Sequence, residues 1–204
     1  GVANFLTDAG SALRVVEGAV VVVDAVSGVE VQTEKLWSEA AALNLPRVVV
    51  ANRLERDRAS LERTLDSLRR VCAREIVPIQ LPIGEEREFT GVVDLVRMKA
   101  LTFAGDSSGK MTEGDVPAAL ADRAAQAREQ LIEMVAEADE SLMEAFFADG
   151  TLTQAQLESG LRAATEHKGA AFVEIYQNCN IFNDGAFDQL KDRDARDDHL
   201  IRRE

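Results

Sequence analysis

The chain has 204 residues, of which 46% are hydrophobic, so it can bury a packed core and does not have the composition of a disordered segment. Its formal net charge of −13 disfavours DNA or other nucleic acid as a partner of the surface as a whole, because phosphate contacts need clustered Lys and Arg. The two cysteines, Cys72 and Cys179, are too few for a disulfide scaffold or a self-contained zinc site. With no signal peptide and no apolar run of membrane length, we expect a cytoplasmic protein that enters no membrane.

The first fifty residues alternate between helical and strand patterns. Apolar residues recur at helical spacing over 3–17, the run GAVVVVDAVSG at 18–28 predicts a strand buried on both faces, and 31–45 predicts a second helix. Pro46 then introduces another apolar run, RVVVAN, which ends at Asn52. Strand, helix and strand with short links form a βαβ unit, so the two strands should be parallel. Ligands of such sheets bind beyond the carboxyl ends of the strands, which places Asn52 at a candidate site.

The remainder of the chain predicts a small antiparallel sheet followed by helices. The expected elements are a helix over 59–72, short antiparallel strands within 75–103, a polar loop over 105–115, one long helix or two in series over 117–147, and a strand and turn over 170–187. Thr153 and Gln156 have the spacing of a capping box, at the start of a further helix. The last residues form a charged tail, which we expect on the surface.

The nearest match to a phosphate-binding loop is AGDSSGKMT. Such a loop has the form G-x-x-x-x-G-K-[ST], in which backbone N–H groups surround the anion. Relative to Gly109 and Lys110, Ala104 replaces the first glycine and Met111 replaces the hydroxyl residue that would hold Mg²⁺. We therefore interpret this segment as a loop that joins a strand to a helix, and the chain as one without a phosphate loop.

The segment N-R-L-E, Asn52 to Glu55, follows the second parallel strand directly and has two interpretations. A guanine reader of the form N-K-x-D uses the Asp carboxylate to accept from the ring N–H and the exocyclic amine, while the Asn amide lines the base edge and the Lys stem packs on the base. The order of amide, basic and acidic residues matches this form. The alternative is a strand end followed by a solvated charged turn, and four residues alone do not decide between the two.

A wider resemblance adds to this motif. The stretch GAVVVVDAVSGVEVQTEKLWSEAAALNLPRVVVANRLERD resembles the G domain of bacterial elongation factor G, the ribosomal translocase. VPIQLPIGEEREFTGVVDLVRMKALTF resembles the insertion that this factor carries inside its G domain, and LIEMVAEADESLMEAFFADGTLTQAQLESGLRAAT resembles the helices that complete the insertion. The resemblance covers residues 1 to about 165 and implies a GTPase that binds GTP or GDP with Mg²⁺ and has the ribosome as its partner.

The resemblance also implies roles for single residues. Asn52 matches the guanine-reading Asn, Arg53 the packing Lys and Glu55 the reading Asp. Because Arg changes the head group and Glu moves the carboxylate outward, guanine preference should weaken about tenfold to a hundredfold. Gly1 matches the glycine of D-x-P-G-H-x-D-F that meets the γ-phosphate, so we expect a truncated G domain. Val2 stands at the water-orienting His, and since valine cannot hydrogen-bond a water, we expect no efficient hydrolysis.

From about residue 166 the sequence resembles a different protein. FVEIYQNCNIFNDGAF is similar to the late part of the β subunit of 2-oxoacid:ferredoxin oxidoreductases, thiamine-diphosphate enzymes with an iron–sulfur cluster. The resemblance implies that Cys179 matches one cluster ligand, although one thiolate cannot hold a cluster that needs about four. We therefore expect a chimera joined near Leu161–Thr165, either an artefact of sequence assembly or a real gene fusion. The artefact is favoured because the junction cuts both parents inside a folded unit.

The predicted fold is α/β: a partial parallel-sheet G domain of the P-loop type that lacks its P-loop, with an α+β insertion. We expect a partial G domain over 1–57, the insertion and its following helix over 58–165, and a foreign tail over 166–204 on the open sheet edge. The predicted function is that of a fragment of an elongation factor G-like protein acting on the ribosome, inactive as a GTPase in this form and without tight binding of GTP, GDP or Mg²⁺. The alternatives are a nucleotide-independent ribosome-binding module and a fragment of the oxidoreductase β subunit.

Overall fold

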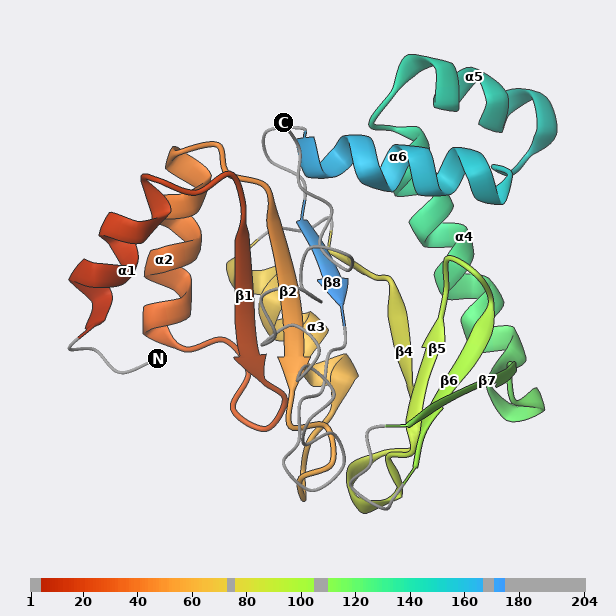
Figure 1. Ribbon diagram of the computed structural model, residues 1–204, viewed down its shortest axis with the longest axis horizontal. Helices are drawn as coiled ribbons and strands as arrows, with labels where there is room; N and C mark the ends of the chain where they lie inside the picture. Colours follow the sequence, from red (N-terminus) through yellow and green to blue (C-terminus); the bar gives the residue numbers. More distant parts are fainter. Residues whose placement is uncertain (1–4, 73–75, 105–109, 167–170, 175–204) are drawn as a thin grey trace, which may run out of the picture.

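The computed structural model of the protein describes residues 5–72, 76–104, 110–166 and 171–174. Its elements form a four-stranded parallel sheet, a four-stranded antiparallel sheet and helices that pack against both (Figure 1). The α/β class that the sequence predicts is therefore confirmed. No helix in the described part of the chain has the length and apolar character needed to cross a membrane.

The parallel sheet has the strand order β1-β2-β8-β3. Its strands are β1 (Ala19–Asp24), β2 (Arg47–Asn52), β8 (Ala171–Glu174) and β3 (Val77–Pro78). β1 and β2 are parallel and in register along their whole length, which confirms the predicted βαβ unit. β8 pairs with β2 on one side and with β3 on the other. The expectation that the tail lies on the open sheet edge is thus wrong for its described strand, which is an interior one.

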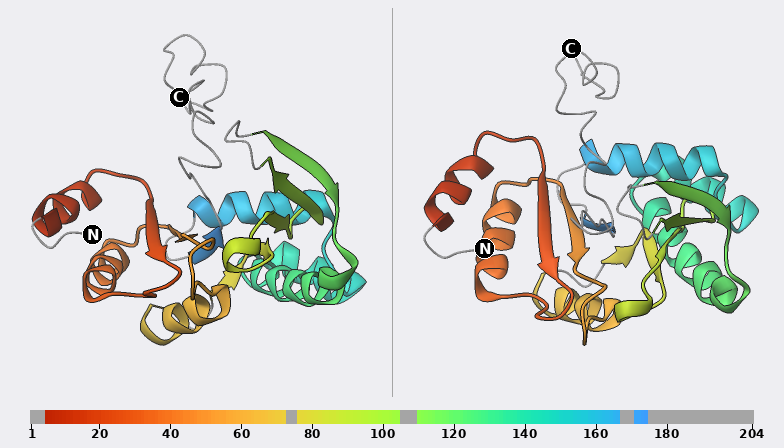
Figure 2. Two further views of the ribbon diagram at one scale, coloured as in Figure 1. Left: turned by 90° about the horizontal axis from the view of Figure 1, so that it is seen from below. Right: turned by 60° about the horizontal axis from the view of Figure 1, so that its bottom comes forward.

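The helices of the parallel sheet are α1 (Leu6–Leu13), α2 (Val31–Ala42) and α3 (Leu61–Val71). Figure 2 shows α2 and α3 on the same side of the sheet, and α1 packs against α2. Ser60 begins α3 by accepting a hydrogen bond from the Arg63 N–H through its side chain. The inward face of α3 carries Leu65 and Leu68, whose exposed fractions are 3% and 0%. Burial of each such leucine contributes roughly 1.5–3 kcal/mol.

β1 differs from the prediction that both of its faces are buried. Val23 is 1% exposed, whereas Val20 and Val22 are 68% and 58% exposed. Among the described strands β1 forms one edge of the parallel sheet, and its alternating side chains leave one face to solvent. A continuous apolar run therefore predicted the strand correctly but could not show that only one face would be covered.

The antiparallel sheet has the strand order β4-β5-β6-β7. Its strands are β4 (Gln80–Ile83), β5 (Gly91–Asp94), β6 (Lys99–Phe103) and β7 (Met111–Asp115). The expected antiparallel strands are confirmed, except that β3 leaves this group to join the parallel sheet. The polar loop predicted over 105–115 is wrong in its second half, because β7 pairs with β6. AGDSSGKMT therefore connects two strands, not a strand and a helix.

The remaining helices cover the antiparallel sheet and one another. They are α4 (Ala121–Ala136), α5 (Glu140–Asp149) and α6 (Gln154–Glu166), with short 3₁₀ turns η2 (Glu86–Glu88) and η3 (Ala118–Leu120). Of the two alternatives for 117–147, two helices in series is confirmed. The capping box is confirmed as well, because the Thr153 N–H donates to Gln156 Oε1 at 2.9 Å and the Gln156 N–H donates to Thr153 Oγ1 at 3.3 Å.

One hydrophobic core joins the two sheets and the helices. Val49 of β2, Leu68 of α3, Leu131 of α4 and Leu157 of α6 are all 0% exposed and belong to the same cluster. The expected boundary at residue 57 falls in the loop between β2 and α3.

Candidate nucleotide-base site

The carboxyl ends of β1 and β2 lie side by side and carry Asp24 and Asn52, which are partners in the parallel register. The Ala25 N–H donates to the Asn52 carbonyl at 2.8 Å, so the two strand ends are joined by the backbone. The chain then turns sharply, because Arg53 has a φ of 65°. This edge is where open parallel sheets bind ligands, so it is the candidate site.

An ion pair connects the two strand ends. Arg53 Nη1 lies 2.8 Å from Asp24 Oδ2, and the Arg53 N–H donates to Asn52 Oδ1 at 3.0 Å. The other Asp24 oxygen accepts from the Val26 and Ser27 N–H groups at 2.8 and 3.3 Å. The guanidinium of Arg53 is therefore held beside Asp24 at the end of β1.

The environment of Asp24 favours its charged form. Burial alone would raise its pKa, but hydrogen bonds from the Val26 N–H, the Arg53 guanidinium and the Ser27 N–H together outweigh burial. The pKa of Asp24 consequently lies below its ordinary value of 3.8. Asp24 is ionised near neutral pH and fixes the position of Arg53.

Glu55 lies in the same loop as Asn52 and Arg53 and is half-exposed. Leu54 and Ala59, with exposed fractions of 5% and 4%, anchor this loop in the core. Asn52, Arg53 and Glu55 therefore lie at the carboxyl end of β2, and their role in base reading stays a prediction. Gly1, Val2 and Cys179 lie outside the described residues.

Asp24 is the site residue that the sequence reasoning missed. The signal was present, since Asp24 ends the first apolar strand just as Asn52 ends the second. In two parallel strands of one register, these two end residues had to become neighbours.

The described residues do not supply a metal site. Within the part of the chain that the structure describes, no group of three or more His, Cys, Asp or Glu could hold an ion. Cys72 ends α3, and burial raises the pKa of its thiol to about 11, although Arg47 nearby lowers it. It is thus a protonated, half-buried thiol.

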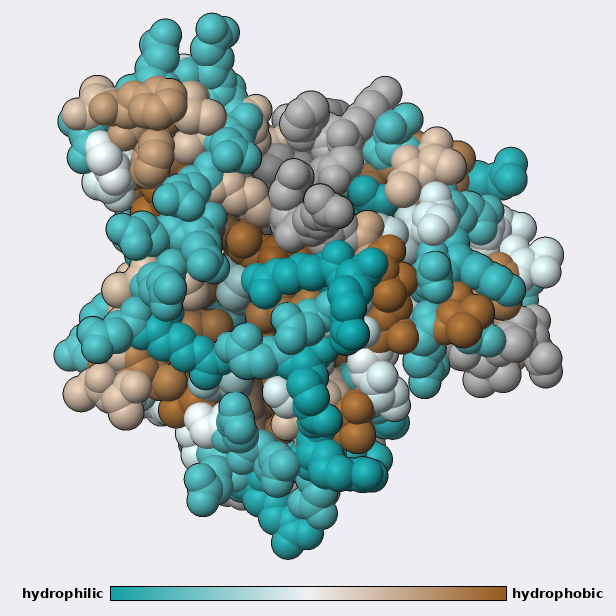
Figure 3. All heavy atoms as spheres, turned by 180° about the vertical axis from the view of Figure 1, so that it is seen from behind, coloured by the Kyte–Doolittle hydropathy of each residue, from teal (hydrophilic) through white to brown (hydrophobic). Residues whose placement is uncertain are grey.

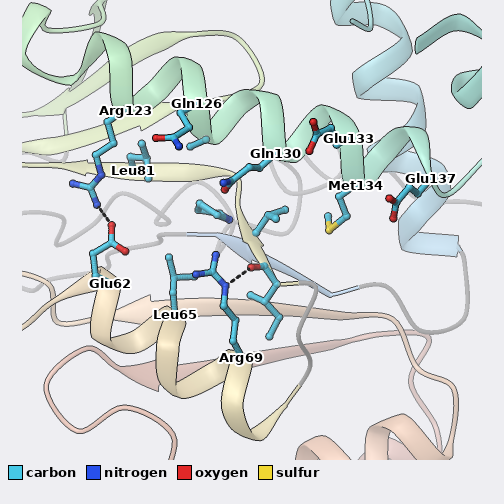
Figure 4. Close-up of a pocket in the computed structure, with 14 residues that line it drawn as sticks. Glu62, Leu65, Arg69, Leu81, Arg123, Gln126, Gln130, Glu133, Met134 and Glu137 are labelled. Carbon is cyan, nitrogen blue, oxygen red and sulfur yellow. Dashed lines mark hydrogen bonds and ion pairs between the residues drawn. The ribbon is translucent and has the colours of Figure 1, made fainter. Parts of the chain in front are cut away.

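A cavity of about 560 Å³ lies between α3 and α4, both of which belong to the largely hydrophilic face in Figure 3. Figure 4 shows Glu62 and Arg123 pointing toward each other across it, and Arg69 donating to the Ile76 carbonyl. Among the described residues, its lining contains no Ser, Cys, His or Lys and no residue of the Asn52–Glu55 loop. The described lining of this cavity is thus separate from the candidate base site.

Comparison with known proteins identifies the family of the chain. The family profile described as "Elongation factor Tu GTP binding domain" matches residues 1–179, and so continues past the expected junction near Thr165. A protein of Thermus thermophilus, known from its crystal structure, is similar to this chain with 30% sequence identity and a TM-score of 0.76. The match covers 87% of this chain and 26% of the Thermus protein, so the chain spans about a quarter of that protein's length. The resemblance to translation GTPases is thereby confirmed, and the chain belongs to the family of the elongation factor Tu GTP-binding domain.

Proposed function

We propose that the Asn52–Glu55 loop reads the base of a guanine nucleotide in a GTPase that acts on the ribosome during translation elongation. The observation that carries this proposal is the position of Asn52, Arg53 and Glu55 at the carboxyl ends of the parallel strands β1 and β2, where Asp24 holds Arg53. The chain belongs to a GTP-binding family, and this edge is where nucleotides bind in open parallel sheets.

Each residue has a distinct part in the proposed recognition. The Asn52 amide lines the edge of the base, and the apolar stem of Arg53 packs on its face while Asp24 holds the guanidinium aside. The Glu55 carboxylate accepts from the ring N–H and the exocyclic amine. A bidentate contact of this kind is worth about 1–3 kcal/mol of discrimination, and the extra methylene of Glu55 relative to Asp weakens it.

We further propose that these 204 residues, taken alone, bind GTP or GDP weakly and do not hydrolyse GTP. The sequence contains no G-x-x-x-x-G-K-[ST] motif, so backbone N–H groups that would surround the phosphates are lacking in it. Val2, at the position of the water-orienting His, cannot hydrogen-bond a water.

The base-reading role can be tested with fluorescent GDP and IDP, which differ only in the exocyclic amine of the base. We expect weak binding of both by the natural chain. Glu55→Asp should raise the ratio of GDP to IDP affinity about tenfold, because the shorter carboxylate reaches the amine and tenfold corresponds to about 1.4 kcal/mol. Asn52→Ala in the Glu55→Asp background should remove the gain.

Asp66→Glu provides the matched control, since it changes an exposed carboxylate of α3 by the same methylene outside the loop and the segment 57–62. A change of the GDP to IDP ratio in this control equal to that of Glu55→Asp would contradict the assignment. Saturable GTP binding by the natural chain at low micromolar concentration, abolished by Asn52→Ala, would contradict the proposed weak binding.

The ribosome is the proposed partner. We propose a partial G domain over 1–57 and an insertion with its following helix over 58–165, of which the insertion has a sheet and helices of its own. A nucleotide-independent ribosome-binding module is the second candidate, and the separate antiparallel sheet favours it. Cosedimentation of the full chain with ribosomes distinguishes the two: GTPase-like binding depends on added GTP analogue, and module-like binding does not.

The origin of residues 166–204 is a separate hypothesis. We propose a junction near Leu161–Thr165 because FVEIYQNCNIFNDGAF resembles the oxidoreductase β subunit. The family match through residue 179 and the interior position of β8 weigh against it. A single sequencing read of source DNA across the codons for Leu152 to Asn180 tests the junction. If one read does not contain both the codons before residue 165 and those after it, the junction is an assembly artefact.

A further inference from the structure

The chain segment that follows the candidate base-reading loop is held by the antiparallel sheet and α4. Below, "the insertion" denotes only this part of residues 58–165, which lies beyond α3. Arg87 donates two hydrogen bonds to the Asp57 carboxylate, Nε to Oδ1 at 3.0 Å and Nη2 to Oδ2 at 3.2 Å. Beside this pair, the Arg58 N–H donates to Glu86 Oε1 at 2.8 Å. Both insertion residues belong to η2, the turn between β4 and β5.

A second contact holds the start of α3, immediately after the same loop. Arg123 of α4 forms an ion pair with Glu62 in the first turn of α3, and Figure 4 shows the two side chains directed toward each other. The insertion therefore contacts the segment 57–62 at both of its ends. We call these contacts, made by Glu86, Arg87 and Arg123, the insertion clamp.

The turn that carries Glu86 and Arg87 has a fixed shape. Gly84 has a φ of 83°, and a Cβ at this position would lie 1.9 Å from the Glu88 carbonyl oxygen, so the turn requires glycine here. The Thr90 N–H donates to the Ile83 carbonyl at 2.9 Å and closes the turn. Glu86 and Arg87 are thus presented to the loop from a rigid support.

The middle of this segment, residues 56–58, also has local contacts, among them a hydrogen bond that the Arg63 guanidinium donates to the Arg58 carbonyl. Leu54 and Ala59 are buried, but Arg56, Asp57 and Arg58 have exposed side chains. Local backbone hydrogen bonds run from the Arg56 N–H to the Arg53 carbonyl and from the Ala59 N–H to the Arg56 carbonyl, at 3.2 and 2.9 Å. The insertion clamp adds restraints from another sheet to these local ones.

The geometry points to Glu86, Arg87 and Arg123 as positioning residues of the base-reading loop. By holding the segment 57–62, these residues set the conformation of the preceding residues, Asn52 to Glu55. A movement of the insertion relative to the parallel sheet would release the loop, so nucleotide affinity and the docking of the insertion are coupled. This inference rests on the proposed function for the role of the loop in base reading, whereas the clamp itself acts in the nucleotide-free protein.

Residue-resolved amide hydrogen exchange of the nucleotide-free chain tests the clamp. Arg87→Ala should raise the exchange rates of the Arg56 and Ala59 amides about threefold, the order that an exposed ion pair supports. The side-chain amide resonances of Asn52 should shift as well. The amides of Val49 and Val50 in β2, and the midpoint of urea unfolding, should not change. The charge-reversed pair Asp57→Arg with Arg87→Asp should restore slow exchange.

Lys99→Ala is the matched control. It removes the exposed ion pair between Lys99 of β6 and Asp115 of β7, and β7 is the edge strand farthest from β4 in the same antiparallel sheet. It should leave the loop amides unchanged. Unchanged exchange at Arg56 and Ala59 in Arg87→Ala, or an equal rise in Lys99→Ala, would overturn the inference.

A second arm separates the inference from the proposed function. In the Glu55→Asp background, Arg87→Ala should lower GDP affinity about threefold, in step with the exchange rates. If exchange responds but no variant binds GDP, the clamp stands and the base-reading function fails. If GDP binds but neither exchange nor affinity responds to Arg87→Ala, the function stands and the clamp fails.

Discussion

Arg53 and Asp24 show how a single ion pair organises the candidate site. The side chains are 49% and 27% exposed, so water screens their attraction and the pair contributes little to the free energy of unfolding. Its geometric effect is larger, because it fixes the guanidinium across the ends of two strands. The lysine of the family pattern would present a single nitrogen to Asp24, whereas arginine presents a planar fork.

The lowered pKa of Asp24 leads to a prediction about acid stability. A folded-state pKa below the unfolded value of 3.8 adds stability that is present above about pH 4 and is lost as pH falls through the folded pKa. Asp24→Asn should therefore lower the free energy of unfolding by about 0.5–1 kcal/mol at pH 7. Urea unfolding of both proteins between pH 7 and pH 3 should show the difference shrinking toward acid. A difference that persists undiminished at pH 3 would contradict this explanation.

At the scale of elements, the contact between α4 and α6 depends on a glycine inside a helix. A Cβ at Gly160 would lie 2.4 Å from Val135 Cγ1 and 2.7 Å from Leu142 Cδ1. Val135 is 1% exposed and β-branched, so its methyl group has no space into which to move. Glycine normally weakens a helix, and here it allows α6 to pack closely on α4.

Gly160→Ala should destabilise the protein by about 1–2 kcal/mol, because overpacking costs more than the better helix propensity of alanine recovers. For a chain of this size the melting temperature should fall by roughly 2–8 °C. Gly114→Ala is the matched control, since a Cβ at Gly114 has nothing within 4 Å. Circular dichroism melts of both variants make the comparison. Equal melting temperatures for the two would show that the α4–α6 contact adjusts to an added methyl group.

At the scale of the whole molecule, β8 completes the parallel sheet. It lies between β2 and β3 and is parallel to both. Without β8, no strand would connect β2 to β3 by hydrogen bonds. Buried backbone N–H and C=O groups of β2 would then lose their partners, which is costly away from water.

A version of the chain that ends at Thr165 should therefore lose its cooperative unfolding transition, while one that ends at Tyr176 and keeps β8 should retain it. Far-UV circular dichroism during urea unfolding distinguishes the two. If the shorter version unfolds cooperatively at the same midpoint, β8 does not contribute to the stability of the parallel sheet.

The sequence predicted a large part of this fold, with failures that have common physical causes. Helical periodicity located the helices, and the apolar runs located β1 and β2. The sequence predicts a loop over Met111–Asp115, because an exposed edge strand carries no apolar pattern. Only the pairing of this segment with β6 makes it a strand. Arg47 begins an apolar strand and is only 7% exposed, because it lies over the Trp37 ring at 4.5 Å from its centroid.

The sequence by itself determined the α/β class, the βαβ unit and the position of Asn52, Arg53 and Glu55 after a parallel strand, since these follow from local patterns and from one resemblance. Only the tertiary structure decided that Asp24 holds Arg53, that one face of β1 is exposed, that β8 is an interior strand and that Glu86 and Arg87 contact Arg58 and Asp57. Each of these depends on a contact between segments far apart in the chain, and periodicity along a sequence carries no information about which distant segment covers which face.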